Sequence, residues 1–197
     1  MIRNLIRDHS GSSAAEFAMV LPLLLIFLFG IIDAGRWLWT YNRGEKATMM
    51  GARFAVVADP IADGLDSSYL GVGGLTQGDS IPASAFGQVS CTDSTCTCAT
   101  APCPTLGTIT RQKFRNIVDR MKLFLPDIGY SNVTVLYSSS GLGYAGNPSG
   151  ADVSPLVTVQ LHDVQFRPIT AFLIASMTMP TTTTTLTAED LRGSQSN

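Results

Sequence analysis

The first third of the chain carries a long apolar run followed by an amphipathic continuation. No charged residue occurs from Phe17 to Ile32, and the stretch 14–32 is close to the roughly 20 residues that a helix needs to cross a bilayer. Beyond it, apolar residues recur every three or four positions until Asp59 and Pro60, which favour a stop. The pattern predicts one long N-terminal helix that ends near residue 58. Its inward face is expected to consist of Ala47, Met50, Phe54 and Val57, and Trp37, Trp39 and Tyr41 are typical of an aromatic belt at a membrane surface.

The pattern changes after the long helix. Residues 59–109 are rich in Gly, Ser and Thr and have no sustained periodicity, which predicts a loop region. The remainder, 110–197, alternates between helix-like and strand-like patterns, and this favours an α+β domain. The predicted elements are a helix at 110–125, strands at 132–138 and 156–164 joined by a long hairpin loop, a short apolar helix at 168–177, and a strand or flexible tract at 181–185.

Composition narrows the classes of function. The chain is 45% hydrophobic and only 14% charged, against a usual charged share of about 25%. The formal net charge is −2, and acids outnumber bases after residue 58, so nothing favours nucleic-acid binding. A membrane segment joined to a polar, weakly charged domain fits this composition.

All four cysteines lie in the predicted loop, at Cys91, Cys96, Cys98 and Cys103. An even number of cysteines in an oxidising compartment predicts two disulfides, and a Cys96–Cys98 bond is disfavoured because so short a loop strains disulfide geometry. Two pairings stay open: Cys91–Cys96 with Cys98–Cys103, or Cys91–Cys98 with Cys96–Cys103. A four-thiolate zinc site is the alternative, but the spacing lacks the usual C-x2-C pairs, so we expect no metal.

No pattern in the sequence supports catalysis. No G-x-S-x-G elbow, P-loop or H-E-x-x-H sequence occurs, and after His9 the only histidine is His162, which we interpret as structural. Asp127, Asp152 and Asp163 could in principle bind calcium, but no loop has EF-hand spacing. We therefore expect neither an enzyme nor a cofactor site.

Glu16 is an acid at the edge of the apolar run, and it has two interpretations. An acid well inside a membrane helix costs about 2.5–3.5 kcal/mol, which points to a function. Alternatively, Ser13 and Glu16 have the spacing of a capping box, in which both side chains satisfy amides at a helix N-terminus. The sequence alone leaves both interpretations open.

The residues around Glu16 resemble a known processing motif. Gly11, followed by four residues, then Glu16 and Phe17, resembles the cleavage motif of type IV prepilins. The resemblance implies that a prepilin peptidase removes a leader, 1–11, by cutting between Gly11 and Ser12, so that the mature helix covers 12–58. It also implies that Glu16 pairs with the new amino group of Ser12, from a neighbouring subunit or from the same chain.

A longer part of the N-terminal region resembles one branch of that family. Residues 13–25, 29–36 and 51–55 are similar to TadE/TadF-like pseudopilins of the tight-adherence (Flp) pilus system, although Asp33 stands where relatives often have Glu. The resemblance implies a single-pass protein of the bacterial inner membrane, with its N-terminus in the cytoplasm and its C-terminal domain in the periplasm or outside the cell. The charges flanking the run do not decide this orientation.

The expected function is assembly. A minor subunit in a pilus, or at its base or tip, would bind other pilin subunits, the pilus assembly machinery, the prepilin peptidase and the membrane. Helices would pack through small residues that permit close approach: Ala18, Gly30, Ala34 and Gly35. The alternatives are an unprocessed, signal-anchored binding domain, a membrane-tethered enzyme, and a cleaved secretory signal. The expected fold is α+β, with a long N-terminal transmembrane helix and a small extracytoplasmic domain that has an antiparallel sheet, a packed helix and a disulfide-stapled loop.

Overall fold

The computed structural model describes residues 12–148, 150–170, 175–188 and 191. The chain forms two compact units. The first contains the chain up to Trp39 together with 165–177, and the second contains 40–164 and the chain from Thr178 onward.

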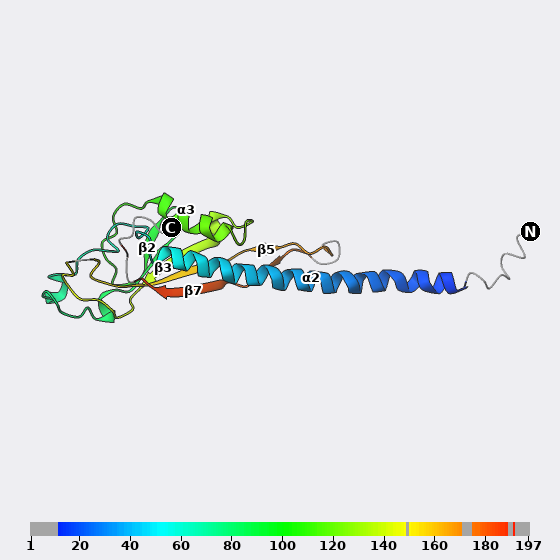
Figure 1. The fold of residues 1–197 in the computed structure, drawn as a ribbon, viewed down its shortest axis with the longest axis horizontal. Coiled ribbons are helices and arrows are strands. Elements are labelled where there is room, and N and C mark those ends of the chain that lie inside the picture. Colours follow the sequence, from blue (N-terminus) through cyan, green and yellow to red (C-terminus); the bar gives the residue numbers. More distant parts are fainter. Residues whose placement is uncertain (1–11, 149, 171–174, 189–190, 192–197) are drawn as a thin grey trace, which may run out of the picture. The chain divides into compact units, whose positions relative to one another are not determined.

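The long N-terminal helix is confirmed. Helix α2, Ser12–Ala55, has 44 residues and is the continuous ribbon in Figure 1. Pro22 lies inside it without ending it. Although α2 ends three residues before the expected end at 58, the amide of Ala58 still donates to the carbonyl of Phe54, so a final turn continues past Ala55. The first part of α2 belongs to the first unit and the rest belongs to the second.

The second unit is built on an antiparallel five-stranded sheet with the order β2-β1-β3-β4-β7. Its central strands confirm the predicted ones, because Val133, Val135 and Tyr137 alternate inward and Val135 pairs with Val159. The Thr tract is a strand as well. The strands are β1 Gln88–Cys91, β2 Cys96–Thr100, β3 Val133–Ser138, β4 Leu156–Leu161 and β7 Thr182–Thr187.

Helix α3, Arg111–Lys122, confirms the predicted amphipathic helix. It buries Phe114, Ile117, Val118 and Met121, which recur at helical spacing. A second, two-stranded sheet pairs β5, Gln165–Phe166, with β6, Met177–Thr178. Three short 3-10 turns complete the described elements: η2 Val72–Gly74, η3 Ala83–Ala85 and η4 Tyr130–Asn132.

The loop predicted at 59–109 is wrong in part, because β1 and β2 lie within it and join the main sheet. Val89 and Cys91 alternate inward and are fully buried, but β1 has only four residues, too few for a clear period-two pattern. Its pairing with β3, in which Val89 faces Tyr137, makes it a strand. Pairing with β3, and not the local sequence pattern, therefore determines that β1 is a strand.

The helix predicted at 168–177 is also wrong in its described part. Ile169 and Thr170 form a turn and Met177 belongs to strand β6, while 171–174 lie outside the described residues. The backbone amides of Ile169 and Thr170 donate to the carboxylate of Asp33. A long-range contact thus replaces the local helical pattern.

The face of α2 that enters the second unit's core consists of small residues rather than the large ones expected. Of the expected residues, Ala47 is fully buried and Phe54 packs against the core, which confirms the prediction there. Met50 is half-buried and Val57, beyond the end of α2, is 40% exposed, so the predicted face is wrong at these two positions. A Cβ atom added to Gly51 would lie 2.8 Å from Cγ of Met121 on α3. Glycine therefore lets α2 approach α3 closely. The buried positions on this face are Gly44, Ala47, Thr48, Gly51, Ala52 and Ala55.

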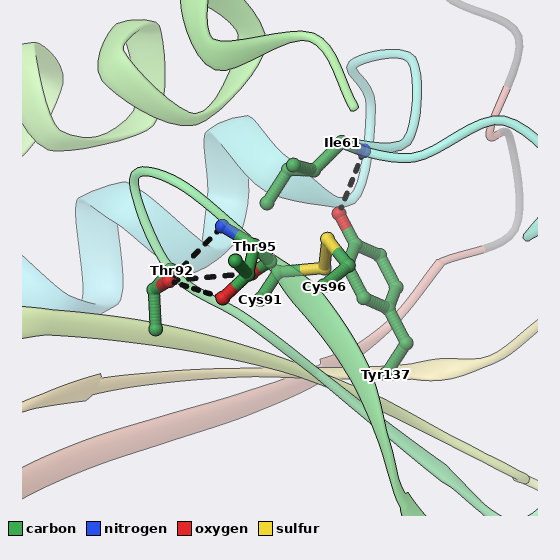
Figure 2. The surroundings of a disulfide bond; sticks show 6 residues. All are labelled: Ile61, Cys91, Thr92, Thr95, Cys96 and Tyr137. Atoms are coloured by element: carbon green, nitrogen blue, oxygen red, sulfur yellow. Dashed lines mark hydrogen bonds between the residues drawn. A yellow bond between two sulfur atoms is a disulfide. The ribbon is translucent and has the colours of Figure 1, made fainter. Parts of the chain in front are cut away.

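The disulfides follow the first of the two predicted pairings, Cys91–Cys96 and Cys98–Cys103. Figure 2 shows the first bond beside a turn in which the hydroxyl of Thr92 donates to the carbonyl of Thr95 and accepts a hydrogen bond from the amide of Thr95. In the same view the hydroxyl of Tyr137 accepts a hydrogen bond from the amide of Ile61, and burial raises the pKa of that hydroxyl. Since the four cysteines form two disulfide pairs, this structure has no free thiolate among them for the alternative zinc site.

Replacing Gly51 tests the close packing of α2. Gly51→Leu should lower the free energy of unfolding by about 1–3 kcal/mol, because the new side chain overpacks the core at Met121. The measurement is thermal unfolding of the full chain in detergent, monitored by circular dichroism. Gly35→Leu is the matched control, since no atom lies within 4 Å of a Cβ added there. Equal melting temperatures for the two variants would contradict the packing described.

Removing each disulfide in turn separates two contributions to stability, the closure of the loop and the burial of the cysteine side chains. Each bond joins residues five apart in sequence, so the chain-entropy model gives each about 2 kcal/mol. The pair Cys91→Ala with Cys96→Ala should cost more than Cys98→Ala with Cys103→Ala, because Cys91 is fully buried and Cys98 is exposed. Denaturant unfolding of the full chain in detergent measures both losses. A larger loss for the second pair would show that burial does not decide the ranking.

Candidate functional site: the apolar helix and its Asp33 clamp

The apolar half of α2 is exposed along its length. Every residue from Ser13 to Leu28 is exposed, including Phe17, Leu23 and Phe27 at 64%, 71% and 68%. This is the one helix among the described residues that is long and apolar enough to cross a membrane. A helix that is apolar on all sides needs a lipid or protein environment around it. The expected membrane anchor therefore has a matching element in the structure.

The processing residues lie at the edge of the described chain. Gly11 lies outside it, and Ser12 is the first residue of α2. Ser13 lies in the first turn of α2, with Glu16 three residues later. The capping-box interpretation of Glu16 stays a prediction. Glu16 and Phe17 are both exposed, on the same stretch of α2 as the apolar surface.

The four small residues proposed for helix packing are all exposed, but they do not form one surface. Gly30 and Ala34 are one turn apart and line the same cavity. Gly35 lies about 100° further around the helix than Ala34, and Ala18 is more than three turns away from Gly30. Nothing lies within 4 Å of a Cβ added at Gly30 or Gly35. The sequence-predicted set is thus divided between different faces.

Asp33 is the buried acid of the first unit. Asp33 is 6% exposed, and its carboxylate accepts hydrogen bonds from a segment more than 130 positions away in sequence. The amides of Ile169 and Thr170 donate at 2.7 and 2.9 Å, and the hydroxyl of Thr170 donates at 2.8 Å. A buried charge is costly unless it is paired and hydrogen-bonded, and these donors satisfy that need. We call this set of contacts the Asp33 clamp.

Arg36 completes the clamp from the next turn of the helix. Its guanidinium group lies 3.0 Å from the Asp33 carboxylate and 3.4 Å from the carbonyl oxygen of Arg167. The same group lies over the ring of Phe166, 5.4 Å from its centroid, in a cation–π geometry. Asp33 and Arg36 together hold the segment 165–170 against α2.

A largely apolar cavity of about 450 Å³ lies between α2 and this segment. Its floor is formed by Gly30 and Ala34, where the absence of large side chains leaves room. Asp33 contributes to the wall together with residues from both strands of the small sheet. The other lining residues are Trp37, Leu38, Phe166, Pro168, Thr170 and Met177.

Comparison with known proteins finds one similarity, in the N-terminal region. A family model described as TadE-like protein matches residues 11–53, which begin at the predicted cleavage site and extend to two residues before the end of the long helix. The N-terminal segment is similar to that family. The match covers 43 of the 197 residues and is consistent with a protein of the Tad pilus system. No curated protein and no solved structure matches the chain.

Sequence reasoning missed the clamp, although Asp33 falls inside the TadE-like segment. The available signal was an acid directly after an apolar run, with Arg36 three positions later. No local pattern indicated that the partners of Asp33 would come from residues 169 and 170. The sequence pattern instead predicts a helix for those residues.

The structure also places the aspartates considered as calcium ligands. The carboxylate of Asp152 is occupied by donors: the amides of Tyr69, Gly146 and Asn147 at 2.6, 2.9 and 2.9 Å, and the hydroxyl of Ser68 at 2.8 Å. The three amide groups have no lone pair to offer, so they cannot coordinate a cation. No group of three potential metal ligands occurs among the described residues. Asp152 therefore fastens loops within the second unit.

The lone histidine of the second unit has structural partners. Nε2 of His162 lies 3.1 Å from the hydroxyl of Thr134 on β3, and Nδ1 lies 2.8 Å from the carboxylate of Asp163. The amide of His162 donates to the carbonyl of Asn132. These contacts tie the end of β4 to the start of β3 and agree with the structural interpretation of His162.

The Asp152 contacts predict a pH-dependent contribution to stability. Burial raises the pKa of this carboxyl group, but the hydrogen bonds from Gly146, Tyr69, Ser68 and Asn147 outweigh burial, so the net pKa is lowered. A group whose pKa is lower in the folded state stabilises the fold above its unfolded pKa, about 3.9 for Asp, and loses this effect as pH falls.

Asp152→Asn should therefore lower the free energy of unfolding by about 1–3 kcal/mol at pH 7, because the amide group of Asn leaves buried donors unpaired. The difference from the wild type should shrink as pH falls below about 4. Urea unfolding of the full chain in detergent across pH measures it. Asp127→Asn, at an exposed position, is the control and should have little effect at any pH. A pH-independent loss at Asp152 would contradict the role of its charge.

Proposed function

We propose that this chain is a minor pilin of a Tad pilus, cleaved between Gly11 and Ser12 and assembled through the apolar half of α2. The observation that carries the proposal is the TadE-like match, which begins at Gly11 and runs the length of the helix. The exposed apolar surface from Ser13 to Leu28 supports it, because that surface needs either lipid or neighbouring helices. Other pilin subunits and the pilus assembly machinery are the partners implied.

The proposed topology has the N-terminus in the cytoplasm and the second unit outside the inner membrane. The two disulfides support it, since such bonds persist in oxidising compartments and are rare in the cytosol. A single apolar helix lies between the cleavage site and the disulfide-bonded unit. One crossing of the membrane therefore separates a cytoplasmic peptidase site from an exported unit.

Glu16 has a specific role in this proposal. Cleavage would give Ser12 a free amino group, which is a cation near the same depth as the Glu16 carboxylate. Pairing the two groups, between subunits or within one chain, would offset the cost of placing either charge in lipid. An intermolecular pair would also set the register between neighbouring helices. Phe17, exposed beside Glu16, would pack in the same contact.

The mature N-terminus tests the proposal directly. Mass spectrometry of the protein from cells with and without the prepilin peptidase should find a peptide that begins at Ser12 only when the peptidase is present. Gly11→Ala should abolish this cleavage almost completely, because the resemblance places Gly11 at the cut. Gly35→Ala, elsewhere in the same helix, is the matched control and should be cleaved normally.

The other outcomes separate the alternatives. An intact N-terminus in both strains would contradict the pilin proposal and favour the unprocessed, signal-anchored binding domain. A start beyond Asp33 would mean that the apolar run is a cleaved secretory signal. Such a cut would also separate Asp33 from the segment that it holds.

A further inference from the structure

The cavity beside the Asp33 clamp reaches into the apolar run. Gly30 lies two residues before Ile32, the end of the uncharged stretch, and Met177 of β6 lines the same cavity. The amides of Ile169 and Thr170 donate to Asp33, which directly follows Ile32. If the run spans the bilayer, then Ile169 and Thr170 lie at the level of its last helical turn. The small sheet therefore reaches the hydrocarbon boundary.

The side chains of this segment fit such a location. Ile169 and Met177 are large apolar residues that are 51% and 43% exposed. Leu38, on the opposite wall of the cavity, is 54% exposed. Exposed apolar surface is unfavourable in water at about 25 cal/mol per Å², and contact with lipid removes that cost. A membrane surface is the environment in which these exposures are favourable.

Two arginines lie next to residues that line the cavity: the guanidinium of Arg36 lies over the ring of Phe166, and Arg167 stands between Phe166 and Pro168 in the chain. The side chain of Arg36 is 46% exposed, and its guanidinium approaches the backbone of Arg167, which is itself exposed. Arginine binds phosphate groups with several donors in a fixed geometry. An apolar cavity with two exposed arginines next to its lining residues in the chain matches the chemistry of a phospholipid, with an acyl chain below a phosphate.

We propose that residues 165–170 and 177 form a second membrane contact, and that the cavity holds an acyl chain of a phospholipid whose phosphate lies at Arg36 and Arg167. The Asp33 clamp positions this contact by fixing Ile169 and Thr170 on α2. The inference rests on the membrane anchoring in the proposed function. It does not depend on cleavage at Gly11.

Site-specific crosslinking tests the contact. A photo-crosslinking phenylalanine analogue replaces Ile169 or Met177 in the full chain, reconstituted into vesicles of phosphatidylethanolamine and phosphatidylglycerol. Illumination should attach lipid at both positions, with a yield of the same order as at Phe27 in the apolar run and about tenfold above that at Thr183. Thr183 is an exposed position on β7, and mass spectrometry detects the adducts.

The controls separate this inference from the proposed function. Lipid adducts at Phe27 but not at 169 or 177 would overturn the inference and leave the anchor intact. No lipid adducts at any position would overturn both. Crosslinks from 169 or 177 to a second copy of the chain, in place of lipid, would overturn the inference and assign the cavity to helix packing.

Two variants test the parts of the site. Asp33→Asn should reduce the lipid adducts at 169 several-fold and leave those at Phe27 unchanged, because the amide group cannot accept every hydrogen bond of the clamp. Asp127→Asn, at an exposed position, is its control.

Arg167→Gln should reduce the excess of phosphatidylglycerol over phosphatidylethanolamine in the adducts, and Arg111→Gln should not. Unchanged adducts in Asp33→Asn or an unchanged lipid ratio in Arg167→Gln would contradict the assigned roles.

Discussion

A single continuous helix, α2, has to be stable in two different environments. Its residues from Ser13 to Leu28 are exposed and almost entirely apolar, whereas its last turns place Ala47, Ala52 and Ala55 in a protein core. A helix can pass between such environments because its backbone hydrogen bonds are made within the segment. Only the side chains have to change. Large apolar residues therefore occupy the first part, and small residues that admit close packing occupy the last.

Two buried carboxylates hold distant parts of the chain by the same physical means. Asp33 in the first unit and Asp152 in the second each accept backbone amide hydrogen bonds, from residues more than 80 positions away in the case of Tyr69 and more than 130 in the case of Thr170. Hydrogen bonds to a charged group are stronger than those between neutral groups, and removing the acceptor leaves several donors unsatisfied. One acid can therefore fix the position of a segment that has little core of its own. The β5–β6 sheet, with two residues in each strand, is such a segment.

The sequence predicts what depends on local periodicity and fails where distant contacts decide. The long helix, α3, β3 and β4 follow from spacings of three to four or of two, and the cysteine pairing is one of the two that strain allows. Strand β1 is too short to show a period, and it exists because Val89 pairs beside Tyr137. The segment 168–177 has a helix-like composition, but Asp33 takes the amides of Ile169 and Thr170. In neither case does the local sequence predict the distant residue that forms the contact.

The proposed lipid contact and the proposed helix packing overlap at Gly30 and Ala34, which line the cavity. A lipid in that cavity and a neighbouring helix packed on it would exclude one another. Association of helices inside a bilayer gains little from the hydrophobic effect, because acyl chains are as apolar as the side chains they replace. Displacing the lipid must then be driven by close packing at small residues and by pairing of charges such as Glu16. In the proposed assembly, the clamp leaves Gly30 and Ala34 open to the cavity. Lipid occupies the cavity first, and a neighbouring helix then replaces the lipid.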